Sequence, residues 1–194
     1  MEFSNDYSGY GNEVLYRMCA EKPLHNDIDV IASKLWIIGR SYSASIERKA
    51  GSNFDIRDAA EIIRKSKIDS KIANITVIER PDLNNLNVIL ETHSYFLKLL
   101  KEATGIEKRS LASKYLHFHA PKAVFIYDSI ANREIRARLK GRRFPISGKH
   151  DKEYTAFCHR AIYYRDNVFE QQIGALTTPR RLDMHLLGYY EQGA

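Results

Sequence analysis

The chain has 194 residues, of which 44% are hydrophobic and 28% are charged, and its formal net charge is +6. This composition is ordinary for a globular protein and excludes global disorder. No apolar run approaches the roughly 18 residues that a membrane-spanning helix needs. The opening residues, MEFSNDYSGYGNEV, are acidic and polar and lack the apolar core of a signal peptide.

Helical periodicity dominates the first half of the chain. Apolar residues recur at steps of three and four over residues 26–49, after Asn26 as the expected N-cap. A shorter helix follows Asp55 and covers residues 55–66. The next helix is expected over residues 81–105, with Pro81 in its first turn and Gly105 as its stop.

The second half continues in the same manner. A helix over residues 107–119 ends before Pro121. Further helices are expected over residues 129–141, 152–174 and 178–190, the last with Thr178 as N-cap and Pro179 as its first helical residue. Short extended pieces are possible at residues 74–79 and 123–127, but no repeated strand–turn pattern predicts a sheet. The sequence therefore predicts one all-α domain of seven or eight helices over residues 1–194.

The positive charge is concentrated in one segment. Residues 133–149, REIRARLKGRRFPISGK, hold seven Lys and Arg and one Glu, as much excess charge as the whole chain. A localised cationic helix and loop is typical of proteins that bind the phosphate backbone of nucleic acids. The alternative is a solvated helix face that maintains solubility. Because the cluster continues past the helix into KGRR, the pattern favours nucleic acid.

Cysteine and histidine give no metal-binding pattern. Cys19 and Cys158 are far apart, which fits a reducing cytoplasm. His117 and His119 form the closest histidine pair, but residues two apart point to different sides of a helix. We therefore expect a cytoplasmic protein with no metal, no other cofactor and no membrane partner.

Four residues form a constellation in the middle of the chain. Gly105 ends one long helix and lets the chain reverse into another, and Ala112 is a small residue early in that second helix. Asp128 follows the apolar stretch AVFIY and begins the basic helix, and Arg133 stands five residues later.

This layout resembles the helix-hairpin-helix DNA glycosylase superfamily, which includes endonuclease III and the 8-oxoguanine glycosylases. The similarity covers roughly residues 86–141. It rests on the Gly105 hairpin, the 16-residue step from Ala112 to Asp128 and the five-residue step to Arg133. The resemblance implies a compact helical glycosylase fold, double-stranded DNA with a flipped base as partner, and Asp128 as the catalytic carboxylate.

Two positions depart from the family pattern. The hairpin has Glu107 where the second glycine of the family belongs, so Lys108 and Arg109 are the candidates to supply charge for a phosphate. Ser110 stands where bifunctional relatives carry a catalytic lysine, and a serine hydroxyl cannot form an imine. The resemblance therefore implies a monofunctional enzyme. Lys114, one helical turn further on, is the possible alternative nucleophile, although a lysine there is more often a surface residue.

Asp128 has a structural and a catalytic interpretation. A plain N-cap accepts backbone N–H bonds and stabilises its helix by about 1 kcal/mol. At the same place, an ionised carboxylate beside a sugar can stabilise an oxocarbenium-like transition state and orient the attacking water. The two roles are compatible.

A flipped nucleotide needs a pocket and its strand needs phosphate contacts. Candidates for the base pocket are Tyr42, His119 and Tyr127, whereas Trp36 is expected in the core. The candidates for DNA contacts share a positive charge and are Arg40, Lys108, Arg109, Arg133, Arg136, Arg138, Arg142 and Arg143.

The resulting hypothesis is a monofunctional DNA glycosylase that excises a damaged or modified base, in repair or in defence against phage with modified bases. The alternative is a non-catalytic DNA- or RNA-binding module on the same fold, which Glu107 favours. A nuclease would need convergent carboxylates with a metal, and the sequence shows no such cluster. Neither the base nor the oligomeric state can be inferred from the sequence.

Overall fold

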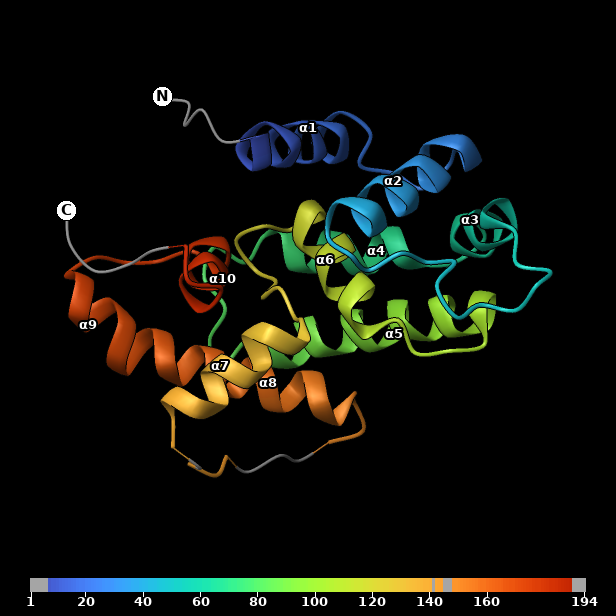
Figure 1. Cartoon of the computed structure of the whole chain (residues 1–194). Coiled ribbons are helices and arrows are strands. Elements are labelled where there is room, and N and C mark those ends of the chain that lie inside the picture. The colour runs from blue at the N-terminus through green and yellow to red at the C-terminus, as the bar shows by residue number, and fades with distance from the viewer. Residues whose placement is uncertain (1–6, 141, 145–147, 190–194) are drawn as a thin grey trace.

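The computed structural model describes residues 7–140, 142–144 and 148–189, which fold into helices joined by loops (Figure 1). No strand occurs within these ranges, so the prediction of an all-α fold is confirmed. None of the described helices is long and apolar enough to cross a membrane. The elements are α1 (Tyr7–Glu21), α2 (Ile28–Ser41), α3 (Ile56–Arg64), α4 (Ile68–Thr76), α5 (Leu86–Thr104), α6 (Arg109–His119), α7 (Ser129–Arg138), α8 (Lys152–Tyr164), a π-helical turn η1 (Arg165–Phe169), α9 (Glu170–Ile173) and α10 (Pro179–Leu186).

Several expected helix ends are confirmed. The Asp55 side chain accepts a hydrogen bond from the backbone of α3, and Thr178 caps α10 in the same way, with Pro179 as first helical residue. Gly105 ends α5 in the left-handed conformation, with φ of 75°, which a residue without Cβ adopts at no steric cost. These ends are encoded locally.

The N-terminal part differs from the prediction in two ways. The helix α1 was not predicted, yet it buries Leu15 against the core. The helix expected over residues 26–49 is capped by Asp27 rather than Asn26 and ends at Ser41. It ends there because the Ala44 N–H bonds back to the Gly39 carbonyl at 2.8 Å, so the chain turns away from the helix axis.

The segment between α3 and α5 also differs. Residues 74–79 were considered extended, but residues up to Thr76 belong to α4, which buries Ile68, Ile72 and Ile75 at helical spacing. The helix α5 begins at Leu86 and not in the turn after Pro81. Its start is delayed because the Asp82 carboxylate accepts the backbone N–H groups of Asn84 and Asn85. These bonds hold a separate turn before the helix.

The bounds of the C-terminal helices agree more closely with those expected from the sequence. Of the expected residues 152–174, residues 152–173 form one helical run in which α8, η1 and α9 follow one another without a break, and Gly174 is its C-cap. The last helix ends at Leu186, and α7 ends at Arg138. The expected ends of these two helices, residues 190 and 141, lie outside the described residues. The apolar segment 123–127, considered extended, begins in a turn at residue 123 and has no regular secondary structure.

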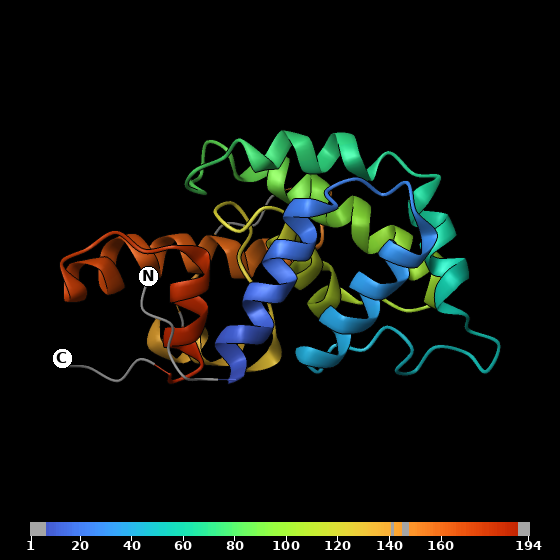
Figure 2. The ribbon, with the colours of Figure 1, turned by 90° about the horizontal axis from the view of Figure 1, so that it is seen from above.

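Two hydrophobic clusters make up the core. The first is built by α1 to α6, and the second by α7, α8, η1 and α10. The long helix α5 contributes to both and contacts α3, α4, α6 and α8, so it is the common scaffold (Figures 1 and 2). The connector from α6 to α7 passes between the clusters, with Val124 in the first and Phe125 in the second. Asp128 stands where this connector ends.

Candidate active site at the N-terminal ends of α6 and α7

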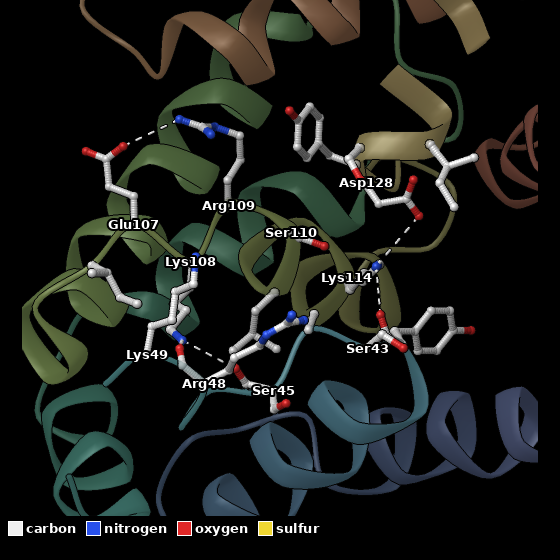
Figure 3. A pocket seen from close by; sticks show the side chains of 17 residues that line it. Ser43, Ser45, Arg48, Lys49, Glu107, Lys108, Arg109, Ser110, Lys114 and Asp128 are labelled. Carbon is white, nitrogen blue, oxygen red and sulfur yellow. Dashed lines mark hydrogen bonds and ion pairs between the residues drawn. The ribbon is translucent and has the colours of Figure 1, made fainter. Parts of the chain in front are cut away.

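A pocket of about 500 Å³ lies where elements of the two clusters meet (Figure 3). One wall is the loop after α2, residues 42–49. The others are the turn and first residues of α6, residues 106–111, and the start of α7. The pocket therefore receives the N-terminal ends of two helices.

Asp128 is both a helix cap and a pocket residue. Its Oδ1 accepts the backbone N–H of Ala131 at 2.8 Å, so the interpretation as an N-cap is confirmed. Its other oxygen, Oδ2, lies 3.8 Å from Lys114 Nζ, and 21% of the side chain is exposed. One carboxylate oxygen is thus used by the helix, while the group as a whole borders the pocket.

Lys114 is buried, which corrects its interpretation as a surface residue. Its side chain is 4% exposed, and Nζ donates a hydrogen bond to the Tyr42 carbonyl at 3.1 Å. Burial lowers the pKa of this lysine, whereas the nearby Asp128 carboxylate raises it. Figure 3 shows the ammonium group between Asp128 and the loop after α2. Lys114 consequently links the two walls of the pocket.

A serine that sequence reasoning missed fixes the residue before Asp128. The Ser113 hydroxyl accepts the backbone N–H of Tyr127 at 3.0 Å and is itself fully buried. This contact ties the connector to α6 one residue before the carboxylate. The position of Asp128 is therefore set from both sides, by α6 and by its own helix.

The N-terminus of α6 adds positive potential. No side chain caps its first turn, which begins at Arg109. The N–H groups of a first helical turn have no partner within the helix, and the helix dipole adds partial positive charge there. Together with the exposed Arg48 and Lys49 at the rim, this end suits an anion such as phosphate.

The loop over the pocket has an unusual backbone. Ser43 and Lys49 have φ of 52° and 63°, a region that residues with a Cβ rarely adopt. Lys108 holds the loop, because its Nζ donates to the carbonyls of Ser45, at 3.3 Å, and of Arg48. Burial lowers the pKa of Lys108. The charge predicted to contact DNA at Lys108 is therefore engaged by the loop.

The three candidates for the base pocket do not lie together. Tyr42 and Tyr127 line the pocket, and the Tyr127 hydroxyl donates to Glu153 at 2.5 Å. His119 does not reach it, so the prediction that His119 belongs to this pocket is wrong. Its Nε2 lies 3.4 Å from Lys34 Nζ, and its ring packs at a tilt against His25. The histidine ends α6, and the connector then carries the chain away from it.

Arg109 forms ion pairs instead of presenting a free charge. It binds the Asp151 carboxylate through two 2.7 Å hydrogen bonds and lies 3.0 Å from Glu153. These bonds hold the pKa of the guanidinium above its ordinary value. Glu107 pairs with Lys101 at 3.1 Å and with Arg109 at 3.4 Å. The hairpin charges thus fasten α6 to α5 and α8.

The remaining DNA-contact candidates lie outside this pocket. Arg40 pairs with Glu47, and its guanidinium lies 6.0 Å from the ring of Trp36, which is 54% exposed and not in the core as expected. Arg133 pairs with its neighbour Glu134 at 3.2 Å. Arg138 donates to the Tyr164 hydroxyl at 3.2 Å. The other three candidates, Arg136, Arg142 and Arg143, line a second pocket at the far end of α7.

A second carboxylate, Asp183 on α10, lies near this site and was missed in the sequence. It is 3% exposed, and its Oδ2 accepts from Arg180 at 2.8 Å, while Oδ1 has no hydrogen-bond partner. Burial raises its pKa to about 7, an effect that the Arg180 charge opposes and the Asp128 charge reinforces. The Arg180 guanidinium also lies 5.7 Å from the Tyr42 ring. The i, i+3 spacing of Arg180 and Asp183 was the one available signal.

The chemistry available here is that of a fixed carboxylate beside a buried cation. Within the described ranges, no group of three or more His, Cys, Asp or Glu side chains is placed to hold a metal ion. Comparisons with protein families, with curated proteins and with solved structures give no match to this chain.

Proposed function

We propose that this chain is a monofunctional DNA glycosylase, which hydrolyses the N-glycosidic bond of a damaged or modified base and leaves an abasic site. The observation that carries the proposal is the Asp128 carboxylate, held at the start of α7 beside Lys114 and facing a pocket. The spacing of Gly105, Ala112, Asp128 and Arg133 supports the same assignment from the sequence.

The proposed reaction breaks the bond between sugar C1′ and the base nitrogen. The electron pair of that bond leaves with the base, and the sugar acquires oxocarbenium character that the negative charge of Asp128 stabilises. Water oriented by Asp128 then bonds to C1′, and the proton that it loses neutralises the base that has left with the electron pair. Lys114 and the Ala131 N–H keep the carboxylate in place throughout.

The pocket suits a base that has left the duplex. Its volume of about 500 Å³ falls in the ordinary range for small-ligand sites. Tyr127, Ile106 and Ile130 give it apolar and aromatic walls, as recognition of a flipped base requires. Phosphates beside the flipped nucleotide would contact the uncapped N-terminus of α6 and the rim residues Arg48 and Lys49.

A second candidate function is a glycosylase with lyase activity, and the burial of Lys114 favours it. A neutral amine at Nζ would bond to C1′ as the base leaves, giving an imine whose β-elimination breaks the strand. Against it, Lys114 Nζ already donates to the Tyr42 carbonyl and pairs with Asp128.

Borohydride reduction during turnover separates the two candidates, because it traps an imine as a covalent protein–DNA adduct. We expect no adduct and no strand break until alkali is added. An adduct that forms with the wild-type protein and disappears in Lys114→Ala would establish the lyase instead.

The glycosylase proposal itself is tested by incubating the protein with genomic DNAs that differ in base modification and measuring abasic sites. We expect abasic sites in at least one class, and none with Asp128→Asn. The class that reacts would also distinguish repair of damage from attack on modified phage DNA. If no class yields abasic sites, the proposal fails and the non-catalytic DNA- or RNA-binding module remains.

A further inference from the structure

A second hollow, of about 590 Å³, lies at the C-terminal end of α7. Four arginines line it, Arg136 from α7, Arg142 and Arg143 from the segment after α7, and Arg160 from α8. Phe144 is a further lining residue. We call these residues the arginine pocket. Three arginines of the 133–149 charge cluster thus share this hollow with Arg160 from a distant segment, which sequence reasoning did not find.

The guanidinium groups of the arginine pocket form no ion pair with a described residue. Within the described ranges, the ion pairs of the chain involve other arginines, and Arg136, Arg142, Arg143 and Arg160 take part in none. Burial lowers the pKa of Arg160, and the charge of Arg136 lowers it further, whereas the Glu153 carboxylate, which forms no ion pair with Arg160, opposes the shift. Like charges brought together in a hollow repel one another, and an anion would relieve that repulsion.

Aromatic rings position one of these guanidinium groups. The Arg142 guanidinium lies 4.0 Å from the centroid of the Tyr163 ring and donates to the Tyr163 hydroxyl. Phe144 meets the same ring edge to face, with centroids 5.5 Å apart. A planar guanidinium stacked on a ring keeps its outer N–H donors free for a bidentate acceptor such as phosphate.

We propose that the arginine pocket binds a backbone phosphate of the DNA strand, at a site separate from the Asp128 pocket. The inference rests on the proposed function for the identity of the strand. A strand fits better than a free phosphate ion, because four guanidinium groups exceed what one small anion needs.

The helix α7 sets the spacing between the two sites. Asp128 and Arg136 are eight residues apart, which corresponds to about 12 Å along a helix axis. One strand of B-DNA rises about 3.4 Å per nucleotide. For α7 laid along the duplex axis, this span corresponds to about four nucleotides between the phosphate in the arginine pocket and the nucleotide at Asp128. The site would hold the strand in register while the pocket at the other end of α7 does the chemistry.

The test measures binding of a fluorescent, undamaged DNA duplex as a function of salt. For Arg136→Gln/Arg160→Gln, we expect several-fold weaker binding and a slope of log affinity against log salt smaller by about one, the loss of one phosphate contact. Arg64→Gln removes an exposed arginine on α3 that pairs with Glu61, and should leave the slope unchanged.

Three outcomes would overturn the proposal. An unchanged slope in the double variant means that the arginines are only a solvated face. An equal change in Arg64→Gln means that general charge, and not the pocket, governs binding. Binding of pyrophosphate, a small-anion probe, is measured on the same variants, and its loss together with an unchanged DNA slope means that the pocket serves a small anion. None of these readouts requires base release, so failure here is distinct from failure of the glycosylase assignment.

Discussion

The two ends of α7 hold positive charge in contrasting ways. At the N-terminal end, the two buried or half-buried lysines are fixed, because Lys114 binds Asp128 and the Tyr42 carbonyl, and Lys108 holds the loop over the pocket. Of the cations that line this pocket, only the rim residues Arg48 and Lys49 are exposed. At the C-terminal end, the arginine pocket has no carboxylate paired with its guanidinium groups among the described residues. A fixed cation positions a catalytic group, whereas an unpaired cation is available to a ligand.

This difference has a physical consequence for mutation. Removing one partner of a buried ion pair leaves the other without compensation and is costly. Removing an exposed cation that has no counter-ion costs little folding energy and alters binding instead. Stability measurements can therefore tell the two ends of the helix apart without any knowledge of the substrate.

The largest expected effect is that of Lys114→Met. The substitution keeps most of the apolar stem but leaves the Asp128 carboxylate without its cation, so we expect unfolding free energy to fall by about 3 kcal/mol. The control is Lys98→Met on an exposed part of α5, which should change it by less than about 0.5 kcal/mol. Chemical denaturation measures both. Equal effects in the two variants would contradict the fixed-cation interpretation.

The next effect concerns Asp183 and pH. Its folded pKa of about 7 lies above the value of about 3.9 for an unfolded aspartate, so the folded state holds a proton that the unfolded state has lost. Between those two values, stability falls as pH rises. The side chain introduced by Asp183→Asn cannot titrate, so the unfolding free energy of this variant should not fall for this reason.

The measurement is the difference in unfolding free energy between Asp183→Asn and the wild type at pH 5 and pH 8. From pH 5 to pH 8, we expect the unfolding free energy of the variant to rise relative to that of the wild type by on the order of 2 kcal/mol. Burial lowers the pKa values of His93 and His117 to about 4, so their contributions to stability have the opposite pH dependence. Because both proteins contain these histidines, their contributions cancel in the difference. A constant difference would mean that Asp183 is ionised in the folded protein throughout this range.

A smaller effect is expected where the pocket loop passes over α2. A Cβ at Gly39 would lie 3.1 Å from Ser45 Cα, a backbone atom that cannot move without moving the loop. Replacing glycine by alanine in a helix ordinarily stabilises by about 1 kcal/mol, and crowding opposes this gain by about 1–3 kcal/mol. We therefore expect Gly39→Ala to be net destabilising and to weaken DNA binding.

The matched control is Gly11→Ala in α1. A Cβ at Gly11 meets nothing within 4 Å, so the same change should raise the melting temperature. If Gly39→Ala stabilises the protein as Gly11→Ala does, then the loop is free to move and the pocket wall is not fixed by this contact.

The smallest effect on stability belongs to the arginine pocket. Arg136→Gln should change unfolding free energy by less than about 0.5 kcal/mol, because the side chain is exposed and has no ion pair with a described residue. Thermal unfolding at low salt is the measurement. A loss comparable to that of Lys114→Met would show that both ends of α7 are structural in the same way.

Helix caps and charge clusters could be predicted from the sequence because they are local. Asp128 had to cap the basic helix, and Gly105 had to end α5, since each role depends on residues only a few positions away. The helix over residues 68–76 was missed because its apolar spacing is short and its last residues resemble a strand.

The partners of the charged side chains could not be predicted in the same way. Lys114 has the sequence appearance of a surface lysine, and it is buried because Tyr42, 72 positions away, provides its carbonyl. Arg109 was assigned to DNA but meets Asp151, which packing of α8 against α5 brings near. Arg160 joins the arginine pocket from another helix. Sequence patterns located the charge, and only tertiary structure showed which charges are engaged.

The central claim is that Asp128 does chemistry beyond capping its helix, and one comparison tests it most directly. Asp128→Asn and Asp55→Asn both replace an aspartate N-cap with asparagine, which caps equally well, so both proteins should fold. On the DNA that yields abasic sites, we expect Asp128→Asn to release base at least about 100-fold more slowly than the wild type while binding DNA as tightly. Asp55→Asn should match the wild type. Base release by Asp128→Asn at the wild-type rate would contradict the account and reduce Asp128 to a helix cap.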